Sequence, residues 1–344
     1  MRCTWRWSTV TGLWGLAAAL YAGFALAASS ESTGTRLDLP TVPPVIDEDP
    51  LFATPTTRDR IGRVVVPVKI NGQGPFRFIV DTGASHSTIS PTAANALGLT
   101  STTLPTIVLD GITGSTTVAA VTIDRLETGA LLLERTAMPV VWVPVLAGAD
   151  GILGAAGLTS QSLLVDFEHN KVSIAGNVGA SMRTRSMRVH GARVAGGLLT
   201  IKTRVAGVWV RAVIDTGAER SLGNIALRDA VLGNKGRGEV ARVTSVYGAT
   251  KDVETGELLK VPVVVIDALR IENVELVFGD FHIFKVWDMA NEPAMIIGMD
   301  VLGTTTALGI DFKHHDLYMA SQGTNGATIL NQGSGASSSS SASH

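Results

Sequence analysis

The amino-acid sequence predicts an all-β protein with few short helices, whose two similar lobes are related by a pseudo-twofold axis. Two observations carry this prediction. A pattern of strand, turn, strand and Asp-Thr-Gly-Ala occurs twice, with its aspartates at Asp81 and Asp215. Glycine is frequent, at 37 of 344 residues, whereas aromatic residues make up only 5%. This balance favours short strands and tight turns over helices.

Each copy of the pattern begins with two strands joined by a tight turn and closes later with an apolar-apolar-Gly run. The four opening strands are expected at residues 64–70, 76–80, 198–205 and 208–214. The aspartates are 134 positions apart, whereas the closing glycines, Gly154 and Gly298, are 144 apart. The difference between these spacings indicates an insertion in the middle of the second copy.

Most of each copy is expected to be strand, with one helix shortly after each aspartate. Further short β-branched runs lie at residues 108–109, 117–123, 130–133 and 139–145. The first helix is predicted to start after the N-cap Ser90, with Pro91 at its first position, and to stop at Gly98. Its counterpart is predicted over residues 224–232 and stops at Gly233.

Residues 1–27 have the form of a cleaved signal peptide. Arg2 and Arg6 supply the positive start, residues 7–26 carry no charge, and Ala25-Leu26-Ala27 fits the small-x-small cleavage pattern. The alternative is an uncleaved membrane anchor, since the apolar run is almost long enough to span a bilayer. We expect a periplasmic or secreted protein with no membrane attachment after cleavage.

The rest of the chain is expected to divide into two lobes flanked by polar segments. Residues 28–60 contain five prolines and are predicted to be an extended lead segment or linker, with a propeptide as the alternative. The lobes are expected at 61–176 and 187–322, joined by a polar, basic linker at 177–186. Residues 323–344 are rich in Gly and Ser and are expected to be disordered.

The composition excludes several classes of protein. A net charge of −2 excludes a strongly basic nucleic-acid binder as well as an acidic tail protein. The one cysteine, Cys3, excludes a disulfide framework and a cysteine-based zinc site. The seven histidines form no recognised metal spacing. We therefore expect no metal, no cofactor and no nucleic-acid partner.

The paired aspartates carry the chemistry. A single Asp-Thr-Gly is weak evidence, because an ordinary turn with Gly at positive φ has the same residues. Two copies, each after an apolar strand, favour a functional site in which Asp81 and Asp215 meet near the pseudo-twofold axis. Two close carboxyl groups share one proton, which leaves an ionised base for a water molecule and an acid for a substrate carbonyl. That arrangement can hydrolyse an amide without a covalent intermediate.

At this point the sequence resembles the retropepsin-like aspartic proteases, in particular their bacterial exported members. The match runs through Val66-Pro67-Val68, residues 71–76 and residues 81–87, and continues at 88–91 and 97–99. It covers about residues 62–320, as two family domains fused in one chain. The resemblance implies that each lobe is a closed β-barrel or sandwich. It also implies a monomer whose lobes form an intramolecular pseudo-dimer.

The resemblance implies a role for each position of the repeated motif. Asp81 and Asp215 would form the catalytic pair, and the threonines after them would bond across the lobe interface. The glycines would let the backbone approach the substrate, and alanine in the next position suggests activity nearer neutral pH than in pepsin. These active-loop residues are Thr82, Gly83, Ala84, Thr216, Gly217 and Ala218, and the residues supporting them from behind are Ser87, Ser221, Gly154 and Gly298.

Two departures from the family pattern leave open that only one lobe is competent. Asp300 in the closing motif of the second lobe is replaced by Ala156 in the first. Ser85 beside the first active loop has Glu219 as its counterpart.

In the family, a hairpin from each lobe closes over an extended peptide. The first flap candidate covers residues 108–118, with its tip at Gly111 to Gly114. The second covers 244–261, with Tyr247 near a tip between Gly248 and Gly256. Ordinary exposed hairpins are the alternative, and a tyrosine at the core or rim would look the same.

Three hypotheses follow for the whole chain. The first is an exported aspartic endopeptidase that hydrolyses peptide or protein substrates in extended conformation. The second is a catalytically inactive peptide-binding or scaffolding protein of the same fold. The third is an enzyme that stays inactive until residues 28–60 are removed.

Overall fold

The computed structural model describes residues 53–55, 57–58, 62–99, 105–141, 146–233, 242–321 and 328–330. The chain divides into two units, residues 1–47 and 48–344, and every described residue belongs to the second. The predicted signal peptide, most of the lead segment and most of the tail therefore lie outside the described residues. In the part of the chain that is described, no helix is long and apolar enough to cross a membrane.

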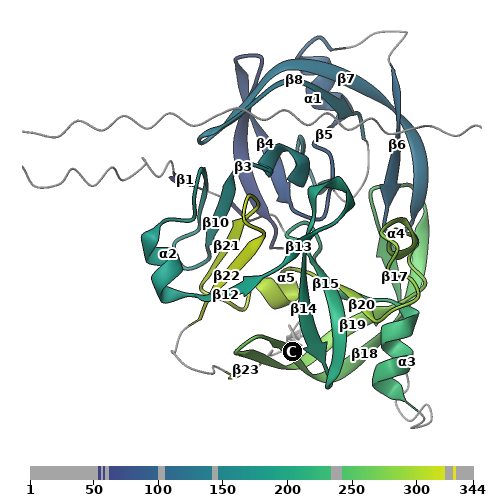
Figure 1. Ribbon diagram of the computed structural model, residues 1–344. Coiled ribbons are helices and arrows are strands. Elements are labelled where there is room, and N and C mark those ends of the chain that lie inside the picture. The colour runs from purple at the N-terminus through teal and green to yellow at the C-terminus, as the bar shows by residue number, and fades with distance from the viewer. Residues whose placement is uncertain are drawn as a thin grey trace, which may run out of the picture. The chain divides into compact units, whose positions relative to one another are not determined.

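The first lobe is a closed barrel of six strands (Figure 1). In barrel order these are β3 (Val64–Ile70), β4 (Gln73–Asp81), β9 (Gly151–Gly154), β5 (Thr88–Ile89), β8 (Leu131–Pro139) and β7 (Gly114–Thr128). Pairing of β3 with β7 closes one side, and a parallel bridge between Ile89 and Val140 closes the other. Strand β6 (Thr106–Gly111) extends β7 as a hairpin beyond the barrel.

The second lobe repeats this barrel with the same strand order. Its strands are β14 (Leu199–Val205), β15 (Val208–Ile214), β20 (Ala294–Ile297), β16 (Leu222–Gly223), β19 (Leu269–Phe278) and β18 (Val253–Ile266). Pairing of β14 with β18 closes it. The additional strands are β17 (Arg242–Tyr247), β13 (Ala192–Arg193) and β23 (Thr328–Leu330). Two closed barrels of equivalent order confirm the predicted all-β fold.

A third sheet, which the sequence did not predict, joins the two lobes. Its order is β1 (Ala53–Pro55), β11 (Lys171–Ala175), β10 (Ser162–Asp166), β21 (Ala307–Asp311), β22 (Asp316–Ala320) and β12 (Met187–His190). At its centre, β10 of the first lobe pairs antiparallel with its counterpart β21 of the second, with Leu164 opposite Gly309. Antiparallel pairing of equivalent strands is the arrangement that a twofold axis through the sheet produces.

The two predicted helices are present, the first with its predicted N-cap. Helix α1 (Pro91–Ala96) starts after Ser90, whose Oγ accepts a hydrogen bond from the Ala93 amide. Helix α3 (Ile225–Leu232) starts after Asn224, whose side chain accepts from the Leu227 amide. The helical elements that the sequence analysis did not predict are α2 (Ala180–Arg185), α4 (His282–Val286), α5 (Met299–Leu302), η2 (Ala155–Leu158) and η3 (Ala195–Gly197).

The structure differs from the expected boundaries at several places. The segment 177–186, expected to be a linker, contains α2, because Met182 buries its side chain against Val178 and Tyr318 beside the third sheet. The tail expected to be disordered supplies β23, which pairs in parallel with β19, so that prediction is wrong for three residues. The lead segment supplies β1 and the short strand β2 (Thr57–Arg58), which pairs with β3. The strand expected at 139–145 ends at Pro139, and residues 142–145 lie outside the described part.

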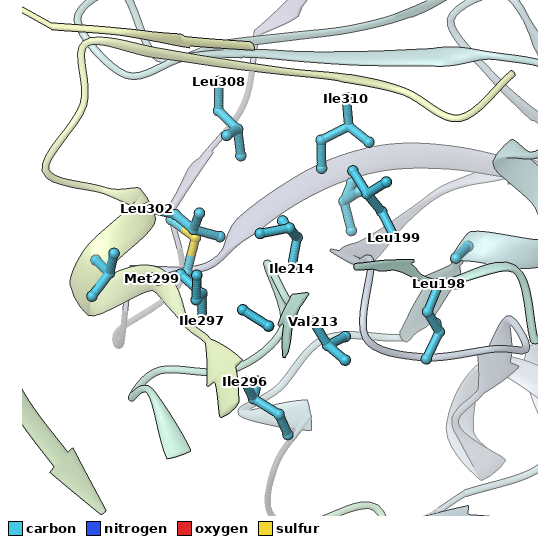
Figure 2. Close-up of a cluster of buried hydrophobic side chains, with 14 of the residues drawn as sticks. Leu198, Leu199, Val213, Ile214, Ile296, Ile297, Met299, Leu302, Leu308 and Ile310 are labelled. Carbon is cyan, nitrogen blue, oxygen red and sulfur yellow. The ribbon is translucent and has the colours of Figure 1, made fainter. Parts of the chain in front are cut away.

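One hydrophobic core runs through both barrels and under the third sheet. Figure 2 shows its centre, where Ile214 and Leu199 of the second barrel lie near Leu308 and Ile310 of β21. The strands that carry the aspartates are therefore anchored in a shared core rather than in two separate ones.

We expect Leu308→Ala to lower the free energy of unfolding by about 2–5 kcal/mol, because a buried leucine leaves a cavity when truncated. Leu308 is 0% exposed and Leu132, a leucine on β8, is 46% exposed. Leu132→Ala is the matched control and should cost within roughly 1 kcal/mol. Urea denaturation compares the two variants. Equal destabilisation by both would contradict the placement of the shared core.

Candidate active site

The two aspartates occupy equivalent places, each at the end of a buried strand. Asp81 is the last residue of β4, and Asp215 follows β15 directly. Each of these strands runs parallel to the later apolar strand of its lobe, β9 or β20. Asp81 is partly buried and Asp215 is buried. Because both strands belong to the shared core, the carboxyl groups are held on rigid elements.

The carboxyl groups of Asp81 and Asp215 are hydrogen-bonded to each other. The glycine after each threonine makes this approach possible. A Cβ atom on Gly83 would lie 2.3 Å from the Asp215 carboxyl, and one on Gly217 would lie 2.2 Å from that of Asp81. Any other residue at either position would collide with the opposite carboxyl group. The structure thus brings together the two residues that the sequence predicts as a pair.

Backbone amides fix the orientation of each carboxyl group. The Gly83 and Ala84 amides each donate to Asp81 Oδ1 at 2.9 Å. The Gly217 amide donates to Asp215 Oδ1 at 2.8 Å. The Ala218 amide donates to the same oxygen at 3.0 Å. The four amides give the two carboxyl groups equivalent backbone donors.

The threonines brace the two active loops against each other. Thr82 Oγ1 donates to the carbonyl oxygen of Ile214 at 2.7 Å and accepts from the Thr216 amide at 3.1 Å. Thr216 Oγ1 donates to the carbonyl oxygen of Val80 at 2.7 Å and accepts from the Thr82 amide at 3.2 Å. Both side chains are fully buried. The resemblance implied such cross-lobe bonds, and the four bonds form a symmetrical set.

The closing glycines lie directly behind the active loops. The Gly154 amide donates to Ser87 Oγ at 3.1 Å, and the Gly298 amide donates to Ser221 Oγ at 3.0 Å. A Cβ atom on Gly154 would lie 2.6 Å from the carbonyl group of His86. Glycine is therefore required where β9 passes behind the loop.

The two departures from the family pattern change side chains but leave the backbone arrangement intact. The Ala156 amide donates to the Ser85 carbonyl oxygen at 3.2 Å, and the Asp300 amide donates to that of Glu219 at 3.1 Å. The Asp300 carboxylate also accepts from the amide and hydroxyl of Ser221, at 3.0 and 2.7 Å. Since the alanine of the first lobe lacks a carboxylate, only the second loop has this additional support.

The environment raises the pKa of both active-site carboxyls, but unequally. Burial raises the pKa of Asp81, whereas hydrogen bonds from Asp215 and two backbone amides, with the charge of Arg63, act to lower it. Burial together with the charge of Asp81 raises the pKa of Asp215 well above its ordinary value. The two carboxyls therefore titrate as a coupled pair, and the stronger upward influence acts on the pKa of Asp215.

Two hairpins, one from each lobe, meet at their tips. In the first, Gly111 lies opposite Gly114 across the turn between β6 and β7. In the second, the turn between β17 and β18 covers residues 248–252. Thr113 Oγ1 and Thr250 Oγ1 lie 2.8 Å apart, and both threonines are buried. The two hairpin tips are therefore in direct contact.

The second tip is shorter than the predicted range from Gly248 to Gly256. Gly248 lies at the turn, where a Cβ atom would come within 2.9 Å of Thr113 Oγ1. Gly256 lies inside β18 opposite Thr244, so it does not belong to the tip. Tyr247 is 61% exposed at the end of β17. The contact between Thr113 and Thr250 was not predicted, although both turns carry the same Gly-x-Thr sequence.

The first hairpin also contacts the second lobe beside its tip, through the pair Asp110 and Ser115. His282 Nε2, at the start of α4, lies 2.8 Å from Ser115 Oγ on β7. The same ring nitrogen lies 3.5 Å from Asp110 Oδ1 on β6. The sequence analysis gave His282 no role. Its contacts connect one lobe's hairpin to the other lobe's barrel.

Within the residues that the structure describes, no three or more His, Cys, Asp or Glu side chains are grouped so that they could hold a metal ion.

Comparison with protein families gives one match, which occurs twice. The model of the aspartyl protease family matches residues 66–156 and again residues 201–301. The two regions contain 192 of the 344 residues, and each includes one Asp-Thr-Gly-Ala motif and one closing glycine. This agrees with the two repeats found in the sequence. Comparison with curated proteins gave no match.

We expect Thr82→Val to destabilise the protein by about 1–3 kcal/mol, because it leaves the Ile214 carbonyl and the Thr216 amide buried without their partner. Thr82→Ser keeps the hydroxyl group and should cost clearly less. Equilibrium unfolding in urea gives both values. If the serine variant is as unstable as the valine variant, the cross-lobe hydrogen bonds do not support the loops.

We expect Asp215→Asn to be stabilising at neutral pH relative to the wild type. The pKa of Asp215 is raised on folding, so the folded state holds its proton more tightly and loses stability as the pH rises above the ordinary carboxyl value of 3.8. Asparagine does not titrate, which removes this loss.

The measurement is the thermal midpoint of both proteins between about pH 4 and pH 7. The difference between them should grow with pH, whereas Asp267→Asn, at an exposed turn residue, should follow the wild type. A difference that stays constant with pH would show that Asp215 titrates normally.

Proposed function

Because the chain belongs to the aspartyl protease family, we propose that it is an exported aspartic endopeptidase that activates water between Asp81 and Asp215. The observation that carries this proposal is the hydrogen-bonded carboxyl pair, held by equivalent loops of two lobes. The signal peptide predicted from the sequence supports export.

Each carboxyl group has a distinct task in the proposed reaction. Asp81, as the ionised carboxylate, takes a proton from a water molecule held between the two groups. Asp215, as the protonated acid, donates a hydrogen bond to the substrate carbonyl oxygen and stabilises the charge that develops there. Attack of the water oxygen on the carbonyl carbon gives a tetrahedral intermediate. Its collapse breaks the C–N bond, and the proton held by Asp81 passes to the leaving nitrogen.

The substrate would be a peptide in extended conformation, bound between the lobes under the two hairpins. Hairpin strands offer main-chain amides and carbonyls that can pair with an extended backbone. The Thr113–Thr250 contact joins the hairpin tips, so it must open to admit an unbroken chain. Entry between hairpins suits a segment in the middle of a substrate, which supports endopeptidase activity.

The departures in the first lobe do not favour an inactive binding protein. Ala156 retains the backbone hydrogen bond that its counterpart Asp300 makes, and both aspartates have the same amide donors. Removal of the entire lead segment would also remove β1 and β2 from their sheets. A latent form activated by removal of residues 28–60 would therefore lose both strands on activation.

We expect Asp81→Asn and Asp215→Asn each to lower peptide-bond hydrolysis by about 10²–10⁴-fold or more, because the two roles depend on each other. Cleavage of an unfolded protein by the chain from Ala28 onward, followed from about pH 3 to pH 8, should give a bell-shaped profile. The control is Asp267→Asn, which should keep full activity. Normal activity of either active-site variant would refute the mechanism. Tight peptide binding without cleavage at any pH would favour a binding protein instead.

A further inference from the structure

We propose that Arg63 is a positioning residue that keeps Asp81 as the ionised base and so assigns the shared proton to Asp215. This inference rests on the proposed function, since it explains how two nearly symmetrical aspartates acquire different tasks. It is carried by the register of the strands that lead to the aspartates and by a difference between the lobes at the residue before each opening strand.

Arg63 directly precedes β3, at the end of the strand pair where Asp81 ends β4. Strands β3 and β4 pair antiparallel, with Val65 opposite Ile79 as the last pair toward this end. Extending this register by two residues would place Arg63 opposite Asp81. Directly opposed residues of an antiparallel pair project to the same face, with Cβ atoms about 4.5–5.5 Å apart. A guanidinium group at this position is within Coulombic reach of the carboxylate.

The second lobe has the same register but a different residue. Thr200 lies opposite Val213, so continuing that pairing brings Leu198 opposite Asp215. Leu198 is 0% exposed and Arg63 is 2% exposed, so both positions are buried. In this extended register one aspartate faces a cation and the other faces a hydrocarbon side chain. This difference breaks the symmetry of the charges around the pair.

The burial of Arg63 increases its influence on the carboxyl. Opposite charges attract more strongly where water is excluded, because solvent screens them less. A buried guanidinium also favours a neighbouring carboxylate in its charged form. The charge of Arg63 acts to lower the pKa of Asp81, whereas the main influences that raise the pKa of Asp215 are burial and the charge of Asp81.

The other charged groups near the loops are either exposed to solvent or act in the same direction as Arg63. His86, Glu219 and Arg220 lie on the active loops but are exposed to solvent. The Asp300 carboxylate behind the second loop accepts hydrogen bonds from the amide and hydroxyl of Ser221. If ionised, this negative charge would disfavour a second carboxylate at Asp215, so it acts in the same direction as Arg63.

The test is Arg63→Leu, which gives the first lobe the side chain that the second already has. Removal of the positive charge should move the acid limb of the kcat/KM profile to higher pH, with activity on that limb falling roughly tenfold for each pH unit of movement. Arg63→Lys keeps the charge and should keep the limb in place. Arg125→Leu, which removes an exposed arginine of the same lobe, is the control.

A second readout does not depend on activity. Carboxyl ¹³C NMR of aspartate-labelled protein, with signals assigned by Asp81→Asn and Asp215→Asn, follows both ionisations directly. The first ionisation of the pair should shift upward in Arg63→Leu and stay in place in Arg63→Lys. Arg63→Gln, polar and uncharged, should shift it as leucine does and replaces the leucine variant if that variant does not fold.

The two proposals fail in different ways. If the wild type cleaves but neither the acid limb nor the carboxyl titration moves in folded Arg63→Leu or Arg63→Gln, the role of Arg63 is refuted and the protease function stands. If the wild type does not cleave, the proposed function fails, and the titration alone decides whether Arg63 assigns the proton.

Discussion

The structure depends on holding two carboxyl groups in contact inside a protein interior. The state in which both carboxyl groups are ionised is unfavourable, because burial removes the water that would screen the two negative charges. A shared proton relieves the repulsion, and backbone amides stabilise the charge that remains. The two threonines then prevent the loops from moving apart, since each hydroxyl group bonds the backbone of the opposite lobe. Retaining this contact requires rigid support from both lobes.

That support comes from the way the lobes are fused. The pairing of β10 with β21 makes one sheet from two lobes, and the hydrophobic core beneath it is continuous. The strands that end at Asp81 and Asp215 are parallel neighbours of β9 and β20, whose closing glycines pass behind the loops. A single chain can also place different residues at equivalent positions. Arg63 and Leu198 differ in this way, which a symmetrical dimer of identical chains cannot achieve.

Features with a local sequence signal were predictable. The Asp-Thr-Gly-Ala motifs, the opening hairpins and the capped helices α1 and α3 are encoded by neighbouring residues, and the repeat predicted that the aspartates would meet. The third sheet has no such local signal, because β10 pairs with β21 of the other lobe. The paired residues Asp166 and Ala307 are 141 positions apart in the sequence. Helix α4 has only five residues, too few for a periodic pattern.

The contact between the hairpin tips and the position of Arg63 were beyond sequence reasoning for the same reason. Thr113 and Thr250 lie in similar turns, but their contact depends on the relative placement of the two barrels. In the sequence, nothing distinguishes Arg63 from the other basic residues. Its proposed relation to Asp81 follows only from the pairing of β3 with β4. Side chains whose roles depend on a partner from a distant segment require the fold before they can be interpreted.

Neutron diffraction from crystals of the chain that starts at Ala28, exchanged into heavy water, tests the central claim most directly. The account predicts a single deuterium between the two carboxyl groups at a pH where the protein is active, bonded to Asp215 and directed toward Asp81. Two deprotonated carboxylates, or a deuterium bonded to Asp81, would contradict it.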